Sequence, residues 1–197
     1  LNLKGAVLYS DAQMDDIRLC LDNVISAYDT GASVSNKTEA VGFIKERGRI
    51  IGIEAQDKLT EKKLLIRASV VINATGAWSN RIVKMDEPDS PDITRPTKGI
   101  HIVYRRLPHQ RAILLQARKD KRVLFIIPWR GYSLIGSTDT DYAGSADDLY
   151  ADSNEVEYLL EEARRVFGVG NLDRGGIITT FAGLRPLVNL QGRPTWQ

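Results

Sequence analysis

The feature that most constrains the fold is residues 70–76, where Val, Val and Ile run directly into Asn-Ala-Thr-Gly. Three consecutive β-branched residues favour a strand buried on both faces, as in a parallel sheet. Gly76 has no side chain, so another group can approach the backbone at the turn that follows. The stretch therefore predicts a ligand-lined turn between a strand and a helix, with an ordinary structural turn as the alternative.

Composition bounds the class of protein. The 197 residues are 43% hydrophobic, enough for one core or for two incomplete halves. The net charge of +2 gives no broad field for gathering nucleic acid or anionic lipid, so we expect no nucleic-acid partner. A single cysteine, Cys20, cannot form an intramolecular disulfide or supply a cysteine metal site, and we expect no metal.

No signal for membrane insertion or export is present. The sequence has no apolar run near the ~18 residues of a membrane span, and its first residues lack the regions of a signal peptide. We expect a cytoplasmic protein, and peripheral attachment to the inner face of the cytoplasmic membrane stays open.

Hydrophobic spacing predicts an α/β (α+β) protein. A helix is expected after a cap at Ser10 or Asp11, and another after a cap at Asp152 or Ser153 with Glu155 closing a capping box. The first helix should bury one face, formed by Ile17, Leu21, Val24, Ile25 and Tyr28.

Predicted strands cover residues 5–10, 32–36, 38–46, 50–56, 63–67, 99–104, 111–116, 122–128, 132–137 and 177–187. The strands after a proline-rich connection at 87–96 indicate a mostly antiparallel sheet.

Two side chains are candidates for chemistry. Alternation along an apolar strand places His101 on the same side as Gly99 and Val103, and it can be a structural histidine or a general base that titrates near neutral pH. Arg185 is embedded in an apolar segment, and its guanidinium requires either an acidic partner or an anionic ligand. His109 lies in a polar turn and is expected to be solvated.

Residues 135–141 end a strand in small and hydrogen-bonding side chains, which suits local turn bonds or the wall of a site. Gly-x-Gly-x-x-Gly, Walker and Gly-x-Ser-x-Gly motifs are absent from the sequence. The residues alone therefore support an α/β protein with an anionic-ligand site, and no specific reaction.

Five motifs in order carry a family resemblance: Tyr9-Ser10-Asp11 with Asp15 to Leu19, Val71 to Trp78, Lys98 to His101, Leu134 to Asp139, and Gly183 to Leu187. Together they resemble the FAD-dependent glycerol-3-phosphate dehydrogenases of the D-amino-acid-oxidase-like flavoenzyme group. The resemblance implies FAD as cofactor, and oxidation of sn-glycerol 3-phosphate to dihydroxyacetone phosphate with electrons passed to quinone. An oxidase that uses oxygen and a non-catalytic anion-binding domain are the alternatives.

The resemblance also assigns residues. His101 matches the active-site histidine, and Arg185 matches the arginine that binds substrate. Further substrate contacts are expected from Lys98 and Thr138. The residues expected beside FAD are Ala74, Thr75, Gly76, Ala40 and Val41.

By the same resemblance, residues 1–31 belong to the substrate-binding region and 32–86 to a partial FAD-binding domain. Residues 87–187 form a substrate-binding cap domain, and 188–197 return toward the FAD domain. The family's glycine loop and the segment after the arginine have no counterpart here. We therefore expect a central part of a longer enzyme that is inactive alone, binds FAD weakly, and self-associates through bare surfaces.

Overall fold

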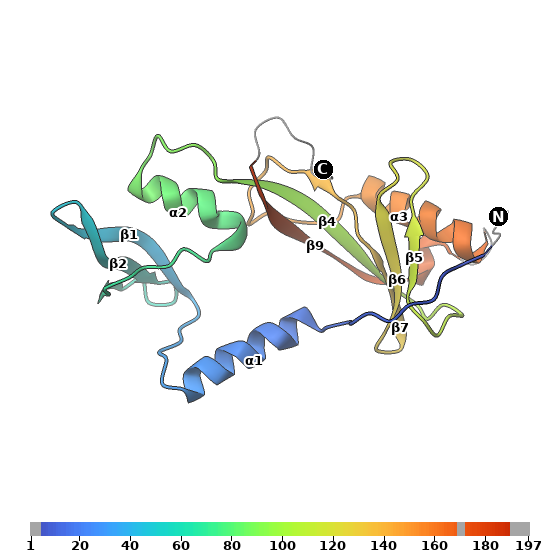
Figure 1. Cartoon of the computed structure of the whole chain (residues 1–197), viewed down its shortest axis with the longest axis horizontal. Helices are drawn as coiled ribbons and strands as arrows, with labels where there is room; N and C mark the ends of the chain where they lie inside the picture. The colour runs from blue at the N-terminus through green and yellow to red at the C-terminus, as the bar shows by residue number, and fades with distance from the viewer. Residues whose placement is uncertain (1–4, 169–171, 190–197) are drawn as a thin grey trace. The chain divides into compact units, whose positions relative to one another are not determined.

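The computed structural model describes residues 5–168 and 172–189 (Figure 1). The chain divides into two compact units, with the boundary in the sequence between Ile72 and Asn73. Each unit is described by itself. The functional domain boundaries expected from sequence remain a prediction.

The first unit contains a helix and a three-stranded sheet. Helix α1 spans Asp16–Asp29, and strands β1 (Thr38–Glu46), β2 (Arg49–Asp57) and β3 (Lys63–Arg67) pair antiparallel in that order. Between β1 and β2, Arg47 and Gly48 both have positive φ, at 50° and 79°. Two such residues form the tight hairpin turn that matches strand twist, and the predicted hairpin is confirmed.

Several expectations for the first unit are wrong. Asp15 caps α1 by accepting a hydrogen bond from the backbone N–H of Arg18, so neither Ser10 nor Asp11 is the cap. Helix α1 has no buried residue, although its apolar face was expected to be core. Residues 5–10 and 32–36 form no strand. Periodicity predicts which face of a helix is apolar, but it does not say what covers that face.

The stretch at residues 70–72 is also not the expected buried strand. Val70 and Ile72 are 73% and 81% exposed, and the stretch has no regular structure. A strand buried on both faces needs neighbours along both edges, and the described residues provide none for this one.

The second unit is built on a six-stranded antiparallel sheet with helices beside it. Its elements in chain order are η1 (Gly76–Trp78), α2 (Ser79–Asp86), β4 (Thr94–Tyr104), β5 (Ile113–Gln116), β6 (Val123–Trp129), β7 (Tyr132–Gly136), β8 (Thr140–Asp141), α3 (Ser153–Phe167), η3 (Arg174–Gly176) and β9 (Ile177–Val188). Strands β7 and β8 pair with one edge of β4, and β9 runs along its other edge. The mixed α/β fold with antiparallel sheets is as predicted.

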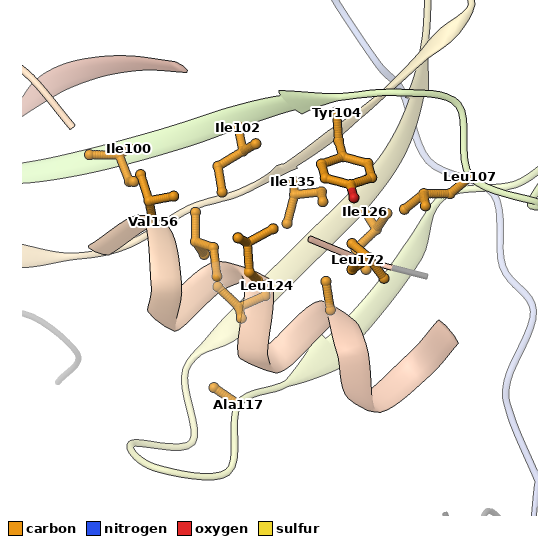
Figure 2. Close-up of a cluster of buried hydrophobic side chains, with 13 residues drawn as sticks. Ile100, Ile102, Tyr104, Leu107, Ala117, Leu124, Ile126, Ile135, Val156 and Leu172 are labelled. Atoms are coloured by element: carbon orange, nitrogen blue, oxygen red, sulfur yellow. The ribbon is translucent and has the colours of Figure 1, made fainter. Parts of the chain in front are cut away.

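The core of this unit lies between the sheet and α3. Figure 2 shows Ile100, Ile102 and Tyr104 of β4 pointing toward the helix, with Val156 of α3 beside Ile100. The predicted capping box starts α3, with Asp152 accepting from the backbone N–H of Glu155 and Glu155 accepting from that of Asp152. Within α3, Arg165 forms an ion pair with Glu162.

Candidate active site

Alternation along β4 sends its side chains to two faces of the sheet. Ile100 and Ile102 lie in the core, so Gly99 and His101 face the opposite side. We call this side the site face, and it is formed by Gly99 and His101 of β4 together with Phe181 and Arg185 of β9. The structure therefore brings the two predicted catalytic residues to one face of two paired strands.

His101 is held between its two neighbouring strands. It lies opposite Gly136 of β7 and opposite Phe181 of β9. Its ring stacks on that of Phe181, with centroids 5.0 Å apart and an interplanar angle of 12°. A Cβ on Gly136 would overlap the imidazole, so the absence of a side chain there makes room for the ring. These contacts fix the plane of the imidazole.

Arg185 is held by the segment after β7. Its Nη2 donates to Ser137 Oγ at 2.6 Å, and its Nη1 donates to the Thr138 carbonyl at 3.2 Å. Asp139 Oδ1 lies 3.6 Å from Nη1 and is the acidic partner that the sequence required as one alternative. The side chain is still 39% exposed, so an anion can also reach it.

The guanidinium of Arg185 lies over Gly99, where a Cβ would overlap it. Gly99 is two residues from His101 on the same strand and therefore on the same face. Glycines thus make room for both functional groups: Gly136 for the imidazole and Gly99 for the guanidinium. The result is a guanidinium and an imidazole on the same face of the sheet, each packed against a glycine.

Lys98 and Thr138, which sequence reasoning placed at the substrate, make their side-chain contacts away from His101. Lys98 Nζ lies 2.8 Å from Glu155 Oε2 and 3.3 Å from Asp152 Oδ2, both at the start of α3. Burial opposes the charge on Lys98, but hydrogen bonds and attraction from Glu155 and Asp152 outweigh it and raise its pKa. The Thr138 hydroxyl is buried and accepts from the Ile100 N–H at 3.0 Å.

The turn predicted beside the cofactor belongs to the same unit. The Asn73 side chain closes it by accepting from the Thr75 hydroxyl and donating to the Ser79 carbonyl. Gly76 has φ of 55°, and no atom lies within 4 Å of where its Cβ would be. Helix η1, which starts at Gly76, packs against β9, the strand of Arg185. An open backbone at this place fits a flat cofactor lying against the turn.

Ala40 and Val41 lie on β1 in the first unit. Ala40 pairs with Ala55 of β2, and the register shifts at Val41. Their expected contact with the adenine of FAD remains a prediction.

His109 differs from its expectation as a solvated turn residue. Its two ring nitrogens contact Ser133 Oγ at 2.9 Å and the Arg111 carbonyl at 3.0 Å, and the ring packs near Phe167. It is a half-buried structural histidine at the other end of β7. Among the described residues, no cluster of His, Cys, Asp and Glu could hold a metal ion, and no helix is long and apolar enough to cross a membrane.

Comparison with known proteins decides the family. The family model described as FAD dependent oxidoreductase matches residues 1–195. The chain belongs to this family. The open turn at Gly76 and the site-face residues His101 and Arg185 therefore lie within a flavoenzyme fold.

Curated relatives of this family member include an alpha-glycerophosphate oxidase from Enterococcus casseliflavus, which is 35% identical over 97% of this chain and 32% of its own length. An aerobic glycerol-3-phosphate dehydrogenase from Staphylococcus haemolyticus is 33% identical over 97% of this chain and 35% of its own length. The chain thus spans about a third of the length of the curated relatives it matches.

A solved structure agrees with the fold of this flavoenzyme chain. The glycerol-3-phosphate dehydrogenase from Bacillus halodurans, complexed with FAD, superposes with a TM-score of 0.85 at 31% identity. The match covers 89% of this chain and 36% of that one.

Some functional neighbours were not identified from sequence. The stacking of Phe181 on His101 was missed, although Phe181 lies only four residues before Arg185 in the same apolar stretch. Ser137 and Asp139 lie within the 135–141 segment, where turn bonds and a site wall stayed open. The structure shows that this segment binds Arg185.

Proposed function

We propose that the complete protein containing this chain is an FAD-dependent oxidoreductase that oxidises sn-glycerol 3-phosphate to dihydroxyacetone phosphate. The observation that carries this proposal is the placement of His101 and Arg185 on one face of β4 and β9. The names of the relatives and of the solved structure support the choice of substrate.

The two residues suit the two demands of the reaction. Removing hydride from a secondary alcohol requires that the hydroxyl proton leave as well, and His101 is positioned to accept it. Arg185 is a fixed cation that can hold substrate oxygens and stabilise negative charge that develops on them. When bound, FAD supplies the acceptor for the hydride.

Residues Ala74, Thr75 and Gly76 would lie against FAD in this proposal, because the turn backbone is open at Gly76. Ala40 and Val41 of β1 are proposed to contact the adenine.

Replacement of His101 tests the assignment. In the complete, FAD-loaded protein, His101→Gln should lower kcat by about 10²-fold or more while changing the Kd for dihydroxyacetone phosphate much less. His109→Gln is the matched control, because His109 lies outside the site face, and it should keep wild-type kcat. Unchanged turnover in His101→Gln would remove His101 from the mechanism.

The electron acceptor is the finer part of the proposal. We propose quinone, with the protein in the cytoplasm or peripheral on the inner face of the cytoplasmic membrane. The oxidase names of several relatives favour oxygen instead. Rates of oxygen uptake and of quinone reduction, both measured with glycerol 3-phosphate as substrate, distinguish the two electron acceptors. Anion binding that depends on Arg185, without any flavin reduction, would instead support a non-catalytic binding domain.

A further inference from the structure

A continuous line of contacts joins the start of α3 to the guanidinium of Arg185. On the core side, Lys98 Nζ binds Glu155 Oε2 at 2.8 Å, and Glu155 Oε1 lies 3.4 Å from Thr138 Oγ1. On the site face, the carbonyl of Thr138 accepts from Arg185 Nη1 at 3.2 Å. Thr138 is therefore the residue at which the two sides of the sheet meet.

Charge fixes the direction of these hydrogen bonds. The carboxylate of Glu155 can only accept, and its Oε2 already receives the Lys98 ammonium and the backbone N–H of Asp152. The Thr138 hydroxyl must therefore donate to Oε1, which leaves its lone pairs for the backbone N–H of Ile100 at 3.0 Å. Thr138, Lys98 and Glu155 are all less than a tenth exposed, so water does not readily replace these partners.

We propose that Lys98, Glu155 and Thr138 are positioning residues for Arg185. Lys98 fixes the carboxylate of Glu155, and the Thr138 hydroxyl binds both this carboxylate and the backbone N–H of Ile100 on β4. Thr138 is thereby held in place, and its carbonyl accepts from the guanidinium. Ser137 precedes Thr138 in the chain, so the same bonds also position the Ser137 hydroxyl, which accepts from Nη2 of Arg185. In this scheme Lys98 supports the site without touching the substrate. The inference deepens the proposed function, because it assigns a structural origin to the substrate-binding geometry of Arg185.

A set of three variants in the complete, FAD-loaded protein tests the proposal. Thr138→Val keeps the shape but loses both hydroxyl bonds, whereas Thr138→Ser keeps them. Ser133→Ala is the matched control: Ser133 is also buried on the sheet, and its hydroxyl accepts from the Leu107 N–H at 3.0 Å, far from Arg185. The probe is dihydroxyacetone phosphate bound to the oxidised protein and followed by calorimetry, with Tm measured in parallel.

We expect Thr138→Val to raise the Kd of the probe about tenfold and Thr138→Ser to restore it to within about twofold. Ser133→Ala should lower Tm by a similar amount to Thr138→Val while leaving the Kd unchanged. A wild-type Kd in Thr138→Val, or an equal rise in Ser133→Ala, would overturn the positioning role.

Failure of the proposed function gives a different result. In that case the wild-type protein neither binds the probe nor oxidises glycerol 3-phosphate. A crystal structure of Thr138→Val then decides the positioning role alone: we expect Arg185 to leave Ser137 Oγ, and an unmoved guanidinium overturns the inference.

Discussion

Gly136 lies opposite His101 across the β4–β7 pair, and a side chain at Gly136 would occupy the space of the imidazole. In Gly136→Ala, the ring must therefore move from its stack on Phe181. Displacing a catalytic group by about 1 Å can cost ~10²-fold in rate, so we expect the rate constant of flavin reduction to fall by about that factor. Stopped-flow reduction of the flavin by glycerol 3-phosphate measures it.

The control for this prediction is Gly175→Ala. A Cβ on Gly175 would make only an ordinary contact, 3.5 Å from Asp173 Oδ1. This variant should keep the wild-type rate of flavin reduction. Equal rates in Gly136→Ala and the wild type would show that the plane of the His101 ring has no bearing on turnover.

Replacing Arg185 by Lys should weaken substrate capture. The guanidinium reaches Ser137 Oγ and the Thr138 carbonyl with two different nitrogens, and a single ammonium cannot reproduce that planar arrangement. We expect KM for glycerol 3-phosphate to rise at least about tenfold, which is about 1.4 kcal/mol. Steady-state kinetics measures the change, and unaltered KM and kcat would leave Arg185 a purely structural partner of Asp139.

The sequence predicted local elements well where residues close together in the chain decide them. The β1–β2 hairpin and the capping box of α3 follow from turn and cap residues close together in the chain. Two predictions were wrong: that α1 buries its apolar face, and that residues 70–72 form a buried strand. Burial depends on neighbours that a local pattern does not identify.

The candidate site shows the same division. His101 and Arg185 were found as residue types with distinctive chemistry on apolar strands. The contact of Phe181 with His101 depends on the register between β4 and β9, which are far apart in sequence. The resemblance placed Lys98 at the substrate, whereas in the structure strand alternation turns its side chain toward Glu155.

The Lys98 cluster predicts how stability depends on pH. Because the pKa of Lys98 is raised, its stabilising effect is complete below the unfolded value of ~10.4 and is lost as pH rises through the folded value. The backbone N–H of Glu155 contributes most to the lowered pKa of Asp152. The stabilisation from ionised Asp152 is complete above its unfolded pKa of ~3.9 and is lost as pH falls through its folded pKa. We expect a stability plateau between these limits.

Urea unfolding of wild type and Lys98→Met across this range measures the effect. At neutral pH the variant should lose about 3 kcal/mol, because a buried carboxylate is left without its cation. Lys84→Met is the control, since the Lys84–Asp92 pair is exposed and worth at most ~1 kcal/mol. The difference between wild type and Lys98→Met should shrink at high pH. A constant difference would show that the Lys98 charge is not what stabilises the start of α3.

The chain by itself is expected to bind FAD weakly. Its turn at Ala74 to Gly76 offers an open backbone, but the sequence has no Gly-x-Gly-x-x-Gly loop to hold the pyrophosphate at a helix N-terminus. Titration of FAD into the purified chain, followed by flavin fluorescence, should give no saturation at submicromolar concentrations. The complete protein, titrated in the same way after removal of its flavin, should bind much more tightly. Submicromolar binding by the chain alone would show that the turn and the sheet face suffice to hold the cofactor.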